Sequence, residues 1–287
     1  MTTPSRAVHV LFRIAGVFLG RARQAGYLGE AGQIRRVLAA TDGSPSGDHA
    51  VRIAEAVCAA AGADLGILGV ETAHLPASVA VGEPVQRTTS TRHITWVAGL
   101  PGIEIARRAA HWNADLIVLG RGERTPASNS LGHTTDTLVR RHDGACLIVP
   151  PTVSRLDRMV IALDGTRRGF GILPTAATFS ATLRSAVAAV CVMPGQIEFG
   201  AAQLPPEEPA MVRVREALSR YPALASSEVR VRQGNPVREI ISYLEEAGAS
   251  LLVLGVRRGG PPGEMGSGHV GQDLLREVPV AILTVPI

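Results

Sequence analysis

Two aspartates, each placed after an apolar run and before a glycine, are the residues of this sequence best suited to bind a ligand. Asp42-Gly43 follows Val-Leu-Ala-Ala-Thr, and Asp164-Gly165 follows Met-Val-Ile-Ala-Leu. A carboxylate at such a position can accept hydrogen bonds from a ribose hydroxyl or an amine. The alternative is local, because Asp-Gly is a common turn pair in which the carboxylate caps the turn. The sequence leaves both interpretations open.

A second group of residues is suited to hold an anion. Gly120 and Gly122 follow one buried strand pattern, and Gly255 follows another. Glycine lets backbone N–H groups approach an anion closely. Val70, at the end of an earlier apolar run, is a further candidate for the same binding region.

The last helical pattern in each half of the sequence opens on glycine. Gly132-His133-Thr134 precedes the first of these patterns and Gly266-Ser267 the second. A helix N-terminus offers free N–H groups and a positive dipole end, where a phosphate can bind. The hydroxyls of Thr134 and Ser267 could donate to a phosphate or merely cap the helix. A histidine at a helix start is more typical of a cap or surface residue than of a general base.

These candidates occur twice because most of the sequence is duplicated. Gly99-Leu-Pro and the Leu-Ile-Val-Leu-Gly segment at 116–120 return 135 residues later as Gly234-Asn-Pro and the Leu-Leu-Val-Leu-Gly segment at 251–255. In both copies, short apolar strands alternate with amphipathic helical patterns. The sequence therefore predicts an α/β fold with two tandem, doubly wound, Rossmann-like parallel sheets. Ligands of such sheets bind outside the carboxyl ends of the strands, where the strand order reverses.

The expected elements follow from these patterns. The first half should have strands near 37–41, 65–70, 94–97, 116–119 and 146–149, and helices near 47–61, 103–113 and 134–141. The second should have strands near 159–163, 188–192, 229–232, 251–254 and 281–285, and helices near 173–183, 210–220, 237–247 and 271–277. The stretch 71–92 has little helical pattern, so we expect the first half to lack one crossover helix. The closing strands, 147–149 and 281–285, are candidates for pairing with each other.

We expect three parts along the chain: a head segment at 1–33, a first domain at 34–150 and a second at 151–287. In the head, Leu11, Ile14 and Phe18 share one helical face. Such an amphipathic helix could pack on its own domain, dock on a partner or lie on a membrane surface. A transmembrane segment is not expected, since no apolar run reaches 18 residues. A signal peptide is not expected either, because Arg13 interrupts the apolar stretch and no small-residue cleavage site is evident.

Composition excludes several classes of protein. The formal net charge is +4, but most of the excess lies in residues 1–33, with four arginines and one glutamate. Both halves are close to neutral, which argues against a nucleic-acid partner. The absence of lysine excludes a Walker-type phosphate loop. Cys58, Cys146 and Cys191 are scattered in apolar patterns without metal-ligand spacing, as expected for free thiols in the reducing cytoplasm.

From about residue 34 to 287 the sequence resembles a tandem universal stress protein. The segments that carry the resemblance are Asp42, Gly99-Leu-Pro101, Gly234-Asn-Pro236, 116–120, 251–255, 145–150 and 279–283. The resemblance implies an α/β fold of the adenine-nucleotide alpha-hydrolase type and a role in stress survival, with ATP bound by some members. It also implies pairing of two such domains, within one chain or between two chains of a homodimer.

Members of that family that bind ATP show glycine, two residues, glycine, nine residues, then glycine with Ser or Thr. In the first half, nine residues separate Gly122 from Gly132, but Gly120 is one residue too close and His133 takes the hydroxyl position. In the second half, only ten residues separate Gly255 from Gly266, where the pattern expects twelve. We therefore expect ATP, with or without Mg²⁺, in the first half more than in the second.

Three functions are compatible with the sequence. The preferred one is an ATP-binding, stress-response regulatory protein without strong turnover, because no catalytic set is evident. A slow ATPase would need a positioned base and charge-stabilising groups or Mg²⁺ ligands. A pseudo-dimeric interaction module that binds no nucleotide would explain the altered glycine spacing.

Overall fold

The computed structural model describes residues 32–72, 85–89, 92–122, 132–194, 207–257 and 268–287. The head segment up to residue 31 lies outside these residues, so its amphipathic helix stays a prediction. Within the described part, no helix combines the length and apolar character needed to cross a membrane.

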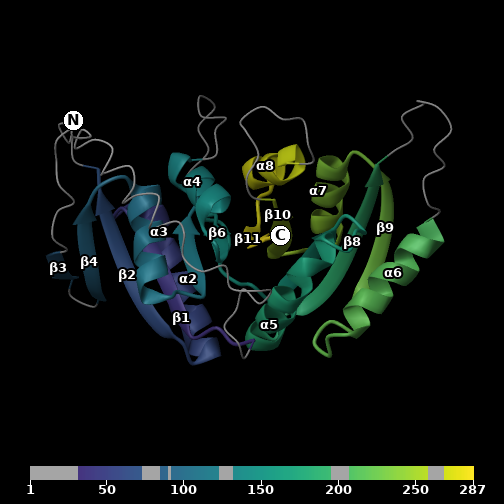
Figure 1. The fold of residues 1–287 in the computed structure, drawn as a ribbon, viewed down its shortest axis with the longest axis horizontal. Coiled ribbons are helices and arrows are strands. Elements are labelled where there is room, and N and C mark those ends of the chain that lie inside the picture. Colours follow the sequence, from purple (N-terminus) through teal and green to yellow (C-terminus); the bar gives the residue numbers. More distant parts are fainter. Residues whose placement is uncertain (1–31, 73–84, 90–91, 123–131, 195–206, 258–267) are drawn as a thin grey trace, which may run out of the picture.

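One 11-stranded sheet runs through the molecule in the order β3-β4-β2-β1-β5-β6-β11-β10-β7-β8-β9 (Figure 1). The strands of the first half (residues 34–150) are β1 (Arg36–Thr41), β2 (Asp64–Glu71), β3 (Val85–Thr89), β4 (Arg92–Ala98), β5 (Leu116–Gly120) and β6 (Ala145–Val149). Those of the second half (residues 151–287) are β7 (Arg158–Leu163), β8 (Ala186–Pro194), β9 (Glu228–Gly234), β10 (Leu251–Val256) and β11 (Ala281–Pro286).

The two halves have the same strand order. β4-β2-β1-β5-β6 and β9-β8-β7-β10-β11 are both parallel, and in both the order reverses beside the first strand. This confirms the predicted α/β fold. The edge strand β3, antiparallel to β4, was not predicted.

Eight helical segments occur in the described part of the chain. They are α2 (Pro45–Ala61), α3 (Pro101–Trp112), α4 (His133–Arg141), the 3₁₀ helix η1 (Gly169–Ile172), α5 (Leu173–Leu183), α6 (Glu207–Ser219), α7 (Pro236–Glu246) and α8 (Gly268–Glu277). All seven predicted helices are present, with bounds shifted by up to three residues. Between β2 and β4 the described residues form β3 and no helix, whereas α6 stands at that position in the second half.

The helices form two layers, one on each face of the sheet. Alternate strand residues point to opposite faces, so Val37 contributes to one apolar cluster and Leu38 to the other. The first cluster contains residues of α2, α5 and α6, and the second contains residues of α3, α4, α7 and α8. Both clusters draw on both halves. Because helices cover both faces of the sheet, its strands are near-continuous apolar runs.

The last strand of each half joins the two halves of the sheet. β6 and β11 are antiparallel neighbours, with Leu147 opposite Leu283 and Cys146 opposite Thr284. The buried Thr284 hydroxyl donates to the Cys146 carbonyl oxygen at 3.2 Å. These are the two closing strands that the sequence offers for such pairing.

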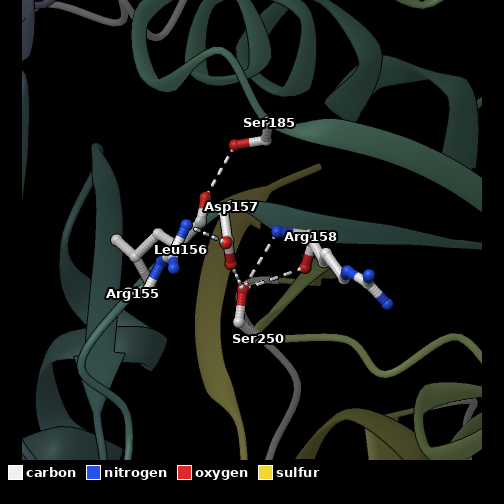
Figure 2. A network of polar contacts seen from close by, with 6 residues as sticks. All are labelled: Arg155, Leu156, Asp157, Arg158, Ser185 and Ser250. Atoms are coloured by element: carbon white, nitrogen blue, oxygen red, sulfur yellow. Dashed lines mark hydrogen bonds and ion pairs between the residues drawn. The ribbon is translucent and has the colours of Figure 1, made fainter.

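Each half satisfies the N–H groups at the start of its first strand differently. In the first half, Oδ2 of the buried Asp115 accepts from the amides of Arg35 (2.9 Å) and Arg36 (3.0 Å). In the second half, the Ser250 hydroxyl accepts from the Arg158 amide at 3.0 Å and belongs to the polar network of Figure 2. Both networks lie at the opposite end of the strands from the predicted site.

Candidate functional site

A cavity of about 400 Å³ lies at the carboxyl ends of β1 and β5, where the strand order of the first half reverses. Ala40 of β1 is the register partner of Leu119 of β5, so the residues that follow them leave the sheet at the same edge. Asp42 and the turn that includes Gly120 both contribute to the cavity wall. This is the position at which open α/β sheets bind ligands.

Asp42 stabilises the turn between β1 and α2. Its Oδ1 atom accepts a hydrogen bond from the Ser44 amide at 2.9 Å, and Gly43 has a φ of 79°, which favours glycine. Burial raises the pKa of the Asp42 carboxyl, but hydrogen bonds from the Ser44 side chain and backbone outweigh burial and hold the pKa below its ordinary value. The carboxylate is therefore charged at neutral pH, and the turn-capping interpretation is confirmed.

The start of α2 presses against the turn after β5. Ser44 is the N-cap residue, whose hydroxyl accepts from the Gly47 amide at 3.1 Å, and Pro45 follows it. The Ser46 hydroxyl donates to the carbonyl oxygen of Arg121 at 2.8 Å. A Cβ atom at Gly120 would lie 2.5 Å from the Ser46 carbonyl oxygen, so this approach requires glycine.

The start of α4 forms another part of the wall. Gly132 is the N-cap residue, and no side chain among the described residues caps this helix. Gly132, Thr134 and the buried Thr135 line the cavity. Among the described residues, no atom lies within 4 Å of a Cβ atom placed at Gly132 or Gly122, so both backbones are open to this part of the structure. Such an N-terminus can donate N–H groups to an anion.

The end of α8 closes the cavity from the second half. Leu275 and Arg276 belong to its wall, and Nη1 of Arg121 donates to the Leu275 carbonyl oxygen at 3.2 Å. Sequence reasoning did not find these two α8 residues, because they lie in the other copy of the repeat. It also missed Ser44 and Ser46 in the wall, although Ser44 before Pro45 is a recognisable N-cap signal.

The structure gathers most of the first-half candidates around this cavity. Asp42, Val70, Gly120, Gly122, Gly132 and Thr134 line it. Gly43 lies beside the wall in the turn after Asp42, and His133 is the exposed first residue of α4.

The second half arranges its candidates differently. Oδ1 of Asp164, the residue before Gly165, accepts from the Thr166 amide at 2.9 Å and from the Thr166 hydroxyl at 2.7 Å, so this carboxylate also caps a turn. Gly165 has a φ of 70°. A Cβ atom at Gly255 would lie 3.0 Å from Ile287 and 3.2 Å from Ile172. Isoleucine side chains therefore crowd the position that the Ser46 backbone takes in the first half.

Two further candidates of the second half, Gly266 and Ser267, lie outside the described residues. Their role as the start of a phosphate-binding helix stays a prediction.

The model of the universal stress protein family matches residues 156–286. The second half of the chain is therefore similar to universal stress proteins. A search of the curated proteins found no significant match.

Solved structures of universal stress proteins resemble both halves of the chain. One from Archaeoglobus fulgidus is 16% identical, covers 88% of this chain and 99% of its own, and has a TM-score of 0.66. A putative universal stress protein from Pseudomonas aeruginosa is 14% identical, with 89% and 94% coverage and a TM-score of 0.61. At these identities the likeness shows the fold. It extends the fold of this family over the first half as well.

A universal stress protein from Archaeoglobus fulgidus in complex with dAMP is similar to about half of the chain. It is 17% identical, covers 47% of this chain and 99% of its own, and has a TM-score of 0.31.

Proposed function

We propose that the cavity of the first half binds an adenine nucleotide, with ATP as the preferred ligand, in a stress-response regulatory protein without strong turnover. The observation that carries the proposal is the cavity itself, placed where the strand order reverses and lined by an acidic turn and a helix N-terminus. Its volume of about 400 Å³ lies in the range of small-molecule sites. We further propose that residues 34–150 and 151–287 are two domains of the universal stress type.

The wall offers different chemistry on different elements. Asp42 accepts hydrogen bonds and suits the ribose hydroxyls or the amine of adenine. The backbone at Gly132 and Gly122 and the hydroxyl of Thr134 can donate to phosphate oxygens. Mg²⁺ is proposed as the ion that accompanies ATP.

For the second half we propose a supporting role in place of a second strong nucleotide site. The neighbours of Gly255 favour this assignment, because they are the apolar side chains of Ile172 and Ile287 where the first half has the polar backbone and hydroxyl of Ser46. Under this assignment the interaction-module hypothesis, which proposes a module that binds no nucleotide, applies to the second half and not to the first.

Isothermal titration with ATP tests the proposal, with Gly132→Val as the informative variant. A side chain here meets none of the described residues, so we expect a loss of about 1 kcal/mol of stability at most, through the helix cap. The same side chain enters the space assigned to phosphate, so the affinity for ATP should fall at least tenfold, a difference of about 1.4 kcal/mol. Gly271→Val is the control, because in the described part of the chain a Cβ atom there also meets nothing within 4 Å and Gly271 is outside the cavity wall.

Thermal melting is the second measurement, because it detects binding even where the heat of binding is small. A ligand that binds only the folded state raises the melting temperature, since at a hundred times its dissociation constant it adds about 2.7 kcal/mol of stability. No heat and no change in melting with millimolar ATP would contradict the proposal. Phosphate release in the same samples would instead favour the slow ATPase.

A further inference from the structure

We infer that the second half completes the nucleotide site of the first: Arg276, at the end of α8, binds the anionic part of a ligand held in the first-half cavity. This inference rests on the proposed function and names a further binding residue for it. The site would then belong to the paired halves and not to one domain.

The position of α8 is fixed by packing. Leu274, Leu275 and Val278 are fully buried in the cluster that also contains α4. Figure 1 shows α4 and α8 at the same end of the sheet, above the junction of β6 and β11. Arg276 therefore extends from a rigid helix, and it belongs to the cavity wall.

A direct contact connects this helix to the glycine turn of the first half. The Arg121 guanidinium donates to the carbonyl oxygen of Leu275, the residue before Arg276. Arg121 also lines the cavity, and its carbonyl oxygen accepts from Ser46 at the start of α2. The end of α8, the turn after β5 and the start of α2 are thus linked by hydrogen bonds around one cavity.

Arg276 can reach an anion at small cost. Its nearest carboxylate partner in the described residues is Asp273, with Nη1 and Oδ1 3.6 Å apart and both side chains 41% exposed. An exposed pair of this kind contributes little to stability. A guanidinium binds phosphate through charge-assisted, often paired hydrogen bonds, which are stronger than those of an exposed ion pair. A phosphate in the cavity should therefore recruit Arg276.

The inference predicts that Arg276 discriminates ligands by their phosphates. Arg276→Gln should weaken ATP binding on the order of tenfold, the effect of losing one hydrogen bond to a charged group. Adenosine should bind this variant and the wild type alike. The matched control is Arg140→Gln, at the end of α4, where Arg140 pairs with Asp136 at 2.8 Å with exposures of 45% and 40%. Arg140 does not belong to the cavity wall, so this variant should bind both ligands normally.

Titration of the three full-length proteins with ATP and with adenosine separates the outcomes. Equal ATP affinity in the wild type and Arg276→Gln would overturn the inference and leave the proposed function standing. An equal loss of ATP affinity in Arg140→Gln would also overturn it, because the effect would then be general charge. Loss of adenosine together with ATP in Arg276→Gln would show a disturbed fold and no phosphate contact. No binding of either ligand to the wild type would overturn both the inference and the proposed function.

Discussion

A single methyl group at Gly120 should damage both the fold and the proposed site. Gly120 ends β5, and a Cβ atom there would lie 2.5 Å from the carbonyl oxygen of Ser46, 2.7 Å from its carbonyl carbon and 2.8 Å from its hydroxyl. Two of these atoms belong to the backbone of α2, so no change of rotamer can relieve the clash. Gly120→Ala must therefore move the start of α2 away from the turn after β5.

The size of the effect follows from these distances. The closest contact must open by roughly 1 Å before it reaches an ordinary separation between nonbonded atoms. Overpacking of this kind costs about 1–3 kcal/mol. At about 2–4 °C per kcal/mol for a protein of this size class, the melting temperature should fall by about 2–12 °C. A shift near 1 Å is also enough to disturb a preorganised site, so ATP should bind more weakly.

Gly122→Ala is the matched control for the melting experiment. Gly122 lies two residues further along the chain, and a Cβ atom there meets no atom of the described residues within 4 Å. Thermal unfolding followed by circular dichroism should show a clear loss for Gly120→Ala and a change within about 0.5 kcal/mol for Gly122→Ala. Equal melting temperatures for the wild type and Gly120→Ala would refute the reasoning, because α2 would then yield without cost.

Two further predictions concern the core. Asp115→Ala leaves two backbone amides without the carboxylate that they share, so it should lower the free energy of unfolding by about 2–4 kcal/mol. Ser250→Ala, which removes a hydroxyl acceptor at the equivalent position, should cost about 1 kcal/mol, and equal urea midpoints would argue against this difference. Burial, with a smaller contribution from nearby carboxylates, raises the pKa of the Cys58 thiol from 9.0 to about 11. The folded state thus holds this proton more tightly, and the stability that it contributes below pH 9 is lost as the pH rises towards 11. The loss of stability over that range should be smaller in Cys58→Ala, and identical pH profiles would contradict the assignment.

The sequence predicted most strands and helices because their apolar spacing is a local property. Among the described residues it missed β3 (Val85–Thr89), which reads Val-Gln-Arg-Thr-Thr and has too few apolar residues to show a strand pattern. β3 forms by pairing with β4 at the edge of the sheet. An edge strand needs less apolar surface than a central one, so its sequence carries a weaker signal.

From the sequence, residues of the cavity wall could be predicted only where the fold of one copy of the repeat brings them together. Asp42 follows β1 and Gly120 ends the adjacent parallel strand β5, so their approach follows from the fold. Arg276 reaches the same cavity through the antiparallel pairing of β6 and β11, a contact between the two copies of the repeat. No spacing within one copy contains that information.

The two copies also show that a repeated motif can have different surroundings. Asp42 and Asp164 cap the same kind of turn, and their capping contacts are formed by residues within two positions in the sequence. Gly120 and Gly255 are also equivalent positions of the repeat. A glycine has no side chain, so residues distant in the sequence decide which atoms occupy the space beside it. In the first half they belong to the backbone of α2, and in the second to isoleucine. Local chemistry is thus shared by both copies, whereas the space beside it is decided by packing with distant residues.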